Sequence, residues 1–391
     1  MSEARINRIS NEKGDGGPSL SGITTFSGLN YFVPPKGTTA ERPSDCPPGS
    51  IRFNTDSAHL EYWDGLQWLE FEATNEEIGG SHSNNTGTGH RGILAGGSNV
   101  PSMDGKIEYI TISTLGNASA FGDEGVDARS YMGTLASSTR ALFAGGYSPG
   151  RVTTISYITF SSTGNSASFG NLTAARWGKT GVSNETRGLF AGGSPSGSQN
   201  GGVVDIEYVT IAQEGTGVDF GDLLTTSWMA GGCASPVRGI FAIGNSGSVP
   251  QNTIEFVTIS TLGNATDFGD STITTRGQGG CSNSTRGMNA GGTTEPSSTS
   301  TNIIDFITIA STGNAQDFGD LTSAKTTAGA CASPTRGIWG GGYVQGSPST
   351  AVDTIDFVTI SSTGNGQDFG DLTQHTYTRG MGGCSNGHGG L

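Results

Sequence analysis

Four copies of the tetrapeptide Asp-Phe-Gly-Asp are the clearest candidate for chemistry in this chain of 391 residues. In protein kinases an Asp-Phe-Gly segment holds magnesium, but an HRD catalytic loop, a strand lysine and a helical lobe accompany it there. None of these features accompanies the copies in this chain, and a motif that recurs at regular intervals marks a structural position. We therefore predict no kinase chemistry for the copies, which begin at Asp219, Asp267, Asp317 and Asp368.

Five cysteines and five histidines could bind a metal or act in catalysis. Four of the cysteines occupy one repeated position that holds Leu135 or Val182 in other repeats, which is typical of a small apolar packing site. Zinc sites need closely spaced Cys or His ligands, and no such spacing occurs. We therefore expect no metal site, no catalytic histidine and no disulfide between repeats. The residues are Cys233, Cys281, Cys331 and Cys384 at the repeated position, Cys46 elsewhere, and His59, His82, His90, His375 and His388.

An arginine begins the same phrase, Arg-Gly-apolar-apolar-Ala-Gly-Gly or a close variant, at six places in the chain. Together the six guanidinium groups could form a basic ring that binds an anion. Alternatively, each one could bond to carbonyl oxygens or to an Asp of a neighbouring repeat. We favour this structural role for Arg91, Arg140, Arg187, Arg238, Arg286 and Arg336.

These arginine phrases return every 47 to 51 residues and divide most of the chain into repeats. After each phrase come a variable Gly-, Ser- and Pro-rich loop, an alternating phrase such as IEYVTI, the Asp-Phe-Gly-Asp segment or a variant, and a small-residue phrase such as AGGCASP. Short runs of Ile, Val, Thr, Phe and Tyr between turn residues predict four strands in each repeat. No segment shows a sustained 3.6-residue period, so we expect little helix.

Four strands in a unit of about 50 residues resemble a blade of a kelch β-propeller. Kelch blades carry an apolar run ending in Gly-Gly, then an aromatic strand, then a strand with a large aromatic residue. Gly-Gly occurs in five repeats, whereas the fourth has Ile243-Gly244, and the Phe of Asp-Phe-Gly-Asp replaces the usual Trp. The resemblance covers residues 77–391 and implies an all-β, kelch-like β-propeller of four-stranded blades. The aromatic residues of the middle strand are Tyr109, Tyr157, Tyr208, Phe256, Phe306 and Phe357.

The number of blades depends on how the two ends of the repeat region pair. With the small-residue strand placed first, six complete blades run from about Glu77 to about Thr373, and one strand is left over from Thr376. Residues 50–76 hold three further short strands, which could join the left-over strand in a closing blade and so remove an open sheet edge. We expect six to seven blades and favour seven with this closure. The alternative is that residues 50–73 form a separate hairpin module.

Residues 1–49 differ from the repeats, with proline at positions 34, 35, 43, 47 and 48 and few strand signals. Proline favours extended backbone, so we predict an extended N-terminal arm. The phrases GSIRFNTD and LEYWDG resemble short modules of phage tail-fibre proteins. Residues 20–73 are similar to the N-terminal region of virion structural proteins from tailed phages, especially phages of marine cyanobacteria. This resemblance implies a virion-attached appendage and assigns no catalytic residue.

Composition excludes several classes of function. The formal net charge of −14 and the pI of about 4.7 would repel a phosphate backbone, so we expect no binding to nucleic acid. No run of 18 apolar residues occurs, so we expect no membrane insertion. The N-terminal residues lack the apolar core of a secretion signal, so we expect synthesis in the host cytoplasm.

Together these features lead us to expect a non-enzymatic phage virion protein, a fibre or appendage propeller present in several copies. Its N-terminal arm, residues 1–49, would attach it to other virion proteins. Variable loops such as Ser194–Val204 and Tyr343–Asp353 would contact a host-surface glycan or protein. The alternative is a purely architectural decoration or connector protein of the capsid, neck or tail. A glycan-cleaving enzyme would need carboxylates clustered in one cleft, whereas this chain repeats its residues evenly, so we expect neither enzymatic activity nor a cofactor.

Overall fold

Two compact units, Met1–Asn84 and Asn85–Leu391, make up the computed structural model of this chain. Their described residues are built from β-strands, with one short 3₁₀ helix and no α-helix. Within these residues, no helix has the length and apolar character that a membrane crossing requires. The structure describes residues 34–57, 59–70, 90–99, 102–124, 128–196, 201–295, 298–345, 350–374 and 378–387.

Unit 1 contains one four-stranded sheet, in the order β1-β2-β3-β4. The three short strands predicted within residues 50–76 are present, and they pair in antiparallel order. Part of the expected N-terminal arm belongs to the same sheet, because β1 pairs in parallel with β2 and is followed by the 3₁₀ helix η1. The elements are β1 (Lys36–Gly37), η1 (Thr39–Glu41), β2 (Ile51–Asn54), β3 (His59–Trp63) and β4 (Trp68–Glu70).

One carboxylate organises the interior of unit 1. Glu61 has no exposed surface, and its Oε2 accepts hydrogen bonds from Arg42 Nη2 at 2.6 Å and from Asn54 Nδ2 at 3.2 Å. Arg52 Nε lies 3.5 Å from Glu61 Oε1. Burial alone would raise the pKa of Glu61, but the hydrogen bond from Arg42 and the other nearby partners lower it below its usual value. Unit 1 is therefore held largely by a buried ionic cluster rather than by an apolar core.

Unit 2 contains six main sheets, each built on four strands, together with short loop strands that form two separate two-stranded sheets and extend one of the six to seven strands. We number the six main sheets in chain order as sheets I to VI. Sheet I has β35 (Gly382–Ser385), β5 (Arg91–Ala95), β8 (Lys106–Thr111) and β9 (Ser119–Asp123); sheet II has β10 (Gly133–Ala136), β11 (Arg140–Ala144), β12 (Thr154–Thr159) and β13 (Ala167–Asn171); sheet III has β14 (Trp177–Ser183), β15 (Arg187–Ser194), β16 (Val203–Thr210) and β17 (Val218–Ser227).

The remaining three sheets follow the same order. Sheet IV has β18 (Gly231–Ala234), β19 (Arg238–Ala242), β21 (Val249–Thr258) and β22 (Thr266–Arg276); sheet V has β23 (Gly279–Ser282), β24 (Arg286–Ala290), β27 (Ile303–Thr308) and β28 (Gln316–Asp320); sheet VI has β29 (Gly329–Ala332), β30 (Arg336–Gly340), β33 (Thr354–Thr359) and β34 (Gln367–Asp371). Short loop strands are β6 (Ser98–Asn99), β7 (Ser102–Met103), β20 (Asn245–Ser246), β25 (Thr293–Thr294), β26 (Thr299–Ser300), β31 (Tyr343–Val344) and β32 (Thr350–Ala351).

The prediction that the C-terminal strand pairs with the strands of residues 50–76 is wrong. Strand β35 pairs instead with β5 and becomes the first strand of sheet I, with Cys384 opposite Ile93. The backbone N–H of Arg91 also donates to Asn386 Oδ1 at 2.7 Å. The physical reason is that the repeat beginning at Arg91 has no small-residue strand of its own among the described residues before it, and β35 supplies one. The strands of unit 1 already form a sheet with β1.

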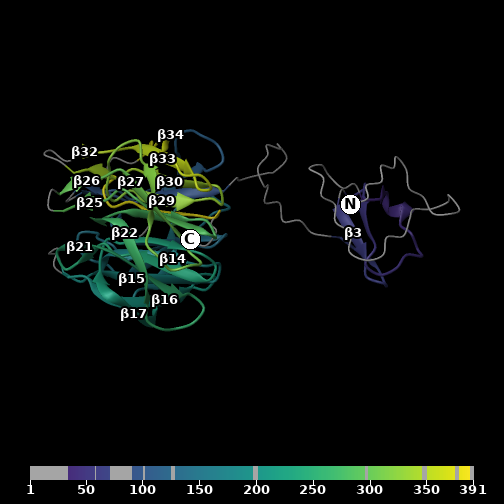
Figure 1. Ribbon diagram of the computed structural model, residues 1–391, viewed down its shortest axis with the longest axis horizontal. Helices are drawn as coiled ribbons and strands as arrows, with labels where there is room; N and C mark the ends of the chain where they lie inside the picture. The colour runs from purple at the N-terminus through teal and green to yellow at the C-terminus, as the bar shows by residue number, and fades with distance from the viewer. Residues whose placement is uncertain are drawn as a thin grey trace, which may run out of the picture. The chain divides into compact units, whose positions relative to one another are not determined.

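The strand named first in each sheet, here called its first strand, contacts the first strand of the next sheet. Strand β10 contacts β14, β14 contacts β18, β18 contacts β23 and β23 contacts β29. Strand β29 then contacts β35, and β35 contacts β10, so the series of contacts returns to its start. In Figure 1, sheet III (β14–β17, teal) and sheet VI (β29, β30, β33 and β34, yellow-green) lie on opposite sides of unit 2.

The same position of these first strands alternates between Ala and Ser. Ser183 in sheet III donates its hydroxyl hydrogen to Ala136 O in sheet II at 2.6 Å. Ser282 in sheet V donates in the same way to Ala234 O in sheet IV at 2.7 Å. Ser385 in sheet I donates to Ala332 O in sheet VI. Every second contact between neighbouring first strands therefore carries this Ser-to-Ala hydrogen bond.

Apolar side chains are buried between consecutive sheets. Each of the six core clusters joins residues of two neighbours, in the pairs I–II, II–III, III–IV, IV–V, V–VI and VI–I. In the III–IV cluster, for example, Leu189 and Phe220 of sheet III pack with Val257 and Ile259, which belong to sheet IV and the turn after it. Each sheet thus buries one face against the preceding sheet and the other face against the following sheet.

The Phe-Gly-Asp segment at the end of each sheet is hydrogen-bonded to a Gly-containing turn of the next sheet. Gly364 N donates to Phe318 O at 2.8 Å, and Asp320 N donates to Asn365 Oδ1 at 3.2 Å. The intervening Gly319 has a φ of +144°, and a Cβ atom there would lie 2.5 Å from Gly364 O. The equivalent backbone hydrogen bond is made by each of the other sheets. The N–H group donates to the Phe carbonyl from Gly164 to Phe121, Gly215 to Phe169, Gly263 to Phe220, Gly313 to Phe268 and Gly116 to Phe369, and the last of these joins sheet I to sheet VI.

Replacing Gly319 by Val should lower the free energy of unfolding by about 2 kcal/mol or more, because the side chain meets a backbone carbonyl and the φ is strained. Urea unfolding followed by tryptophan fluorescence measures this change. Gly215→Ala is the control, since a Cβ atom at Gly215 meets nothing within 4 Å. Equal stability of the two variants would contradict the close approach of sheets V and VI.

Candidate functional site

Each repeated arginine joins its own sheet to a neighbouring one. The guanidinium of Arg238 lies over the Phe256 ring, 4.6 Å from its centroid, and its Nη1 donates to Ile309 O of sheet V at 2.9 Å. Stacking on a ring while bonding to a carbonyl uses both properties of the planar guanidinium. The structural role is confirmed. The matching aromatic and carbonyl partners are Tyr109 and Phe160 for Arg91, Tyr157 and Ile211 for Arg140, Tyr208 and Ile259 for Arg187, Phe306 and Ile360 for Arg286, and Phe357 and Ile112 for Arg336.

The four repeated cysteines are buried free thiols in the first strands, as predicted for an apolar packing position. Burial raises the pKa of Cys233 and of Cys331 to about 12, so these thiols stay protonated at neutral pH. The pKa of Cys281 and of Cys384 is also raised well above its usual value by burial. Cys46 in unit 1 is a half-buried free thiol.

The histidines do not come together in the described structure. His59 lies in β3 of unit 1, with Nδ1 3.7 Å from Glu70 Oε2, and His90 precedes β5 in unit 2. His82, His375 and His388 lie outside the described residues. Where the chain is described, no three side chains of His, Cys, Asp or Glu lie together in a way that could hold a metal ion.

A series of buried acidic residues, which the sequence analysis did not single out, holds the linkers between sheets. In sheet III, Glu207 Oε2 accepts from Thr173 N at 2.8 Å, and Glu207 Oε1 lies 2.9 Å from Lys179 Nζ. In sheet VI, Asp356 Oδ2 lies 2.5 Å from Lys325 Nζ. Burial lowers the pKa of both lysines, against the opposing effect of their carboxylate partners. These acidic residues could have been found from the sequence, because Glu207 and its equivalents occupy the second position of the IEYVTI phrase in most repeats.

Sheet II departs from this pattern in a compensating way. Ser156 stands at the acidic position, and Arg129 Nη2 donates to its Oγ. Arg129 Nε also donates to Glu124 Oε2 at 3.0 Å, and both side chains are about 1 % exposed. The acid has therefore moved from the strand to the linker, and the buried charge is still paired.

All six variable loops leave their sheets at one end. After the second strand of each sheet, a loop residue pairs with the residue that leads into the first strand of that sheet, as Trp228 does with Asn245 and Thr326 with Tyr343. Because these partners stand at equivalent points, the loops share the end where the first strands begin. Residues 197–200 and 346–349 of the two predicted contact loops lie outside the described residues. Equivalent pairs are Ser98 with Arg379, Ser130 with Tyr147, Trp177 with Ser194, and Arg276 with Thr293.

Aromatic rings and one arginine gather at this end. The ring centroids of Tyr131 and Trp177 lie 5.2 Å apart, and those of Trp177 and Trp228 lie 5.1 Å apart. Arg379 stacks on Tyr343 at 4.6 Å, and its Nε donates to the Tyr131 hydroxyl oxygen at 2.7 Å. Tyr131 and Trp177 remain half-exposed, so this end offers flat apolar faces beside a guanidinium group. Trp177, Trp228 and Arg379 stand at one letter of their repeats, and the other repeats have Ser130, Arg276 and Thr326 there, so the repeat pattern did not reveal them.

A chain of backbone hydrogen bonds links the residues that precede the first strands. Gly178 N donates to Tyr131 O at 2.7 Å, Met229 N donates to Gly178 O at 2.8 Å, and Gly277 N donates to Met229 O at 2.9 Å. Thr327 N then donates to Gly277 O, and Tyr131 N donates to Gly380 O. All six residues have φ between +56° and +75°. Glycine therefore alternates with Tyr131, Met229 and Thr327 in a conformation that disfavours side chains.

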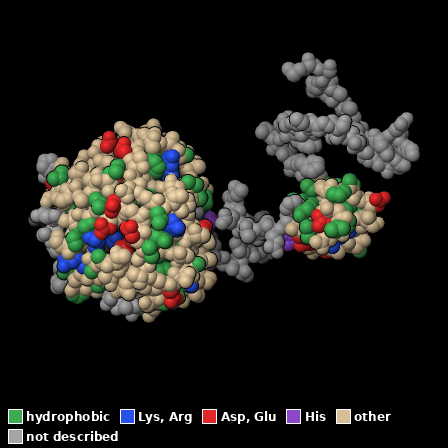
Figure 2. Space-filling view, turned by 90° about the horizontal axis from the view of Figure 1, so that it is seen from below, with side chains coloured by type: hydrophobic (Ala, Val, Ile, Leu, Met, Phe, Trp, Pro, Cys, Tyr) green, Lys and Arg blue, Asp and Glu red, His purple; other side chains and the backbone are tan. Residues whose placement is uncertain are grey.

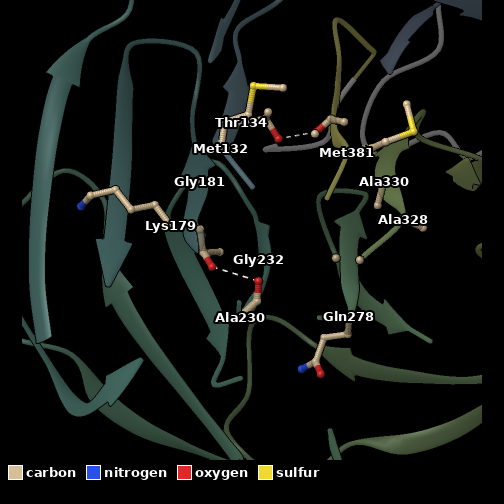
Figure 3. Close-up of a pocket in the computed structure, with 15 residues that line it drawn as sticks. Met132, Thr134, Lys179, Gly181, Ala230, Gly232, Gln278, Ala328, Ala330 and Met381 are labelled. Carbon is tan, nitrogen blue, oxygen red and sulfur yellow. Dashed lines mark hydrogen bonds between the residues drawn. The ribbon is translucent and has the colours of Figure 1, made fainter. Parts of the chain in front are cut away.

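First strands enclose a small cavity of about 90 Å³ (Figure 3). Thr134 Oγ1 donates to Gly383 O at 2.8 Å, and Thr180 Oγ1 donates to Ala230 O at 2.9 Å. The Lys179 side chain points away from the cavity toward Glu207 (Figure 3). Sites for drug-sized ligands measure about 300–1,000 Å³, so this cavity holds only water, an ion or a very small molecule.

No protein-family model matches this chain, and no curated protein matches it either.

Replacing Arg238 by Ala should lower the free energy of unfolding by about 1–3 kcal/mol, because both the stacking on Phe256 and the hydrogen bond to sheet V are lost. Urea unfolding measures the change. The exposed Arg151→Ala variant removes the same charge and should change stability by less than about 0.5 kcal/mol. An unchanged stability for Arg238→Ala, together with weaker binding of inorganic phosphate, would restore the anion-binding interpretation.

With a thiol reagent such as DTNB at pH 8, one thiol per native chain should react rapidly, namely Cys46. The four buried thiols should react only after denaturation, because burial keeps them protonated and out of contact with the reagent. The absorbance of the released thiolate counts the reacting groups. Cys46→Ser should abolish the fast phase; a fast phase that survives this substitution would show that a first strand opens in the native state.

Proposed function

We propose that unit 2 is a closed, six-bladed, kelch-like β-propeller, with sheets I to VI as its blades. Three independent series of interactions support this arrangement, and each returns to its starting sheet. They are the contacts between first strands, the six apolar clusters, and the arginine bridges that end with Arg336 Nη1 donating to Ile112 O at 2.9 Å. In this proposal β35 of the C-terminal region closes the ring as the innermost strand of blade I, which removes the open edge.

We infer that the protein is a non-enzymatic virion appendage of a tailed phage, and that its propeller displays loops for recognition of the host surface. The observation that carries this inference is the emergence of all six variable loops at one end, beside Tyr131, Trp177 and Arg379. Loops on a rigid scaffold are common recognition elements. The side of unit 2 that Figure 2 shows, seen from below Figure 1, is mostly uncharged, with Lys, Arg, Asp and Glu in small mixed groups.

Unit 1 would attach the appendage to other virion proteins. On one face of its sheet Ile51 is 51 % exposed and Leu60 is 41 % exposed, and Leu66 in the turn before β4 is 89 % exposed. Apolar side chains that a small unit leaves in water often lie at protein interfaces. The same observation favours the second candidate function, a purely architectural decoration or connector of the capsid, neck or tail that binds only virion proteins.

Shortening the loop between Val344 and Thr350 to two glycines should reduce adsorption of the particle to its host at least about tenfold, a loss of about 1.4 kcal/mol in binding, while particles still assemble. Residual infectivity in the supernatant measures adsorption, and electron microscopy of labelled particles locates the protein. Val237→Ser, in the exposed turn between β18 and β19 and away from the variable loops, is the control. If adsorption is normal when all six loops are shortened and the label lies on the capsid or neck, the architectural function replaces the receptor-binding one.

A further inference from the structure

Sheet V differs from the other sheets at one buried point. Asn289 in β24 lies opposite Asp305 in β27, and it is only 8 % exposed. At the position of Asn289 the other five sheets have Leu94, Phe143, Phe190, Phe241 and Trp339, all of them completely buried. A buried amide in place of a large apolar side chain is costly unless its polar atoms have partners. Asn289 Oδ1 is buried and has no hydrogen-bond partner in the protein.

The charge at this point also differs from that in the related sheets. Glu207 and Asp356 are paired with Lys179 and Lys325. Lys325 stands two residues before Thr327, the positive-φ residue that precedes the first strand of sheet VI. Lys179 stands one residue after Gly178, the equivalent positive-φ residue of sheet III. The corresponding residues of sheet V are Thr275 and Gln278, which are neutral. Among the described residues no Lys or Arg forms an ion pair with Asp305, which accepts hydrogen bonds only from Thr272 N at 2.9 Å and Thr272 Oγ1 at 2.5 Å.

These residues line a cavity of about 10 Å³, which is about the space of one water molecule. Its wall includes Asp305, Asn289, Thr275 and Gln278, and Thr275 Oγ1 donates to Gln278 Oε1 at 2.5 Å. Asn289 Oδ1 also approaches the neighbouring first strand closely, since a Cβ atom at Gly231 would lie 2.2 Å from it. Four of the lining side chains thus carry oxygen atoms, and of these only Asp305 can carry a charge.

Gln278 lines both this cavity and the cavity of about 90 Å³ that the first strands enclose. In Figure 3 its amide group extends away from the first strands.

We propose that this cavity in sheet V is a binding site for a monovalent alkali cation, sodium or potassium. The ion would be bound by the Asp305 carboxylate, by Asn289 Oδ1 and by the oxygen atoms of Thr275 and Gln278. Its single positive charge balances the single carboxylate, as the ammonium groups of Lys179 and Lys325 do in sheets III and VI. Calcium or magnesium would leave an uncompensated positive charge in this buried site, because Asp305 is the only carboxylate among the residues that line it. The inference does not depend on the proposed virion function.

Sheet IV provides a comparison within the same chain. Glu255 also lacks a lysine or arginine partner among the described residues, and burial raises its pKa. Its cross-strand neighbour is Phe241, however, so no amide oxygen is added beside it. A protonated carboxyl suits that apolar surrounding. Burial raises the pKa of Asp305 as well, against the hydrogen bonds from Thr272, so a cation bound beside Asp305 would favour its ionised form.

Thermal unfolding of the full chain in sodium, potassium and choline chloride tests the proposal. At about 0.15 M of each salt exposed charges are equally screened, whereas only the alkali ions fit the cavity. We expect the unfolding midpoint to be about 2 °C or more higher in sodium or potassium chloride than in choline chloride. Asp305→Asn should abolish this difference, and so should Thr275→Lys, which places an ammonium group where sheet VI has Lys325.

Asp219→Asn, which neutralises an exposed carboxylate in sheet III, is the matched control and should keep the difference between salts. Broadening of the ²³Na NMR line by the wild-type protein, reversed by potassium, provides a direct measurement that needs no variant. Equal midpoints in the three salts and no ²³Na broadening would overturn the proposal and assign Asp305 a proton. A salt difference that persists in both Asp305→Asn and Thr275→Lys would place the ion elsewhere and overturn it equally.

Discussion

Unit 2 depends on one constraint: no sheet in it can bury its own faces, so every sheet must be joined to its neighbours. The six apolar clusters each draw residues from two sheets, and none lies within one sheet alone. Polar interactions then determine how closely the sheets approach. The arginine at the start of each second strand binds a carbonyl of a neighbouring sheet, and the glycine after each repeated Phe leaves room for the next turn.

Buried charge follows from the same constraint. The linker between two sheets starts with an exposed residue, such as Thr173 or Thr272, whose backbone N–H group points inward and needs an acceptor. In five of the six sheets the acidic residue of the third strand provides one, as Glu207 does for Thr173. A buried carboxylate needs a counter-charge, and the chain solves this differently from sheet to sheet, with Lys179, with Lys325, or with Arg129 and Glu124 beside Ser156. The variation lies in the linkers, which differ more than the strands do.

The strands, their order and the burial of the cysteines could be predicted from the sequence, because those residues recur at a fixed interval and local composition determines them. The structural role of Arg238 and its equivalents could be predicted for the same reason. The pairing of β35 could not be predicted, because it could have joined either the three strands of residues 50–76 or the three strands that begin at Arg91. Only the observed pairing with β5 distinguishes the two. Asn289 and Thr275 were also missed. Each departs from the repeat at a single letter, and only the arrangement in space shows that the two departures meet.

The alternation of Ser and Ala along the first strands has a consequence for symmetry. Ser183, Ser282 and Ser385 belong to every second sheet, and the glycines among the six positive-φ residues fall in those same sheets. Two consecutive sheets, rather than one, are therefore the smallest portion of the chain whose chemistry recurs. The three Ser-to-Ala hydrogen bonds and the three positive-φ glycines repeat with a period of two sheets, whereas the residues that line the cavity between the first strands, such as Thr134, Gly232 and Ala330, differ from sheet to sheet.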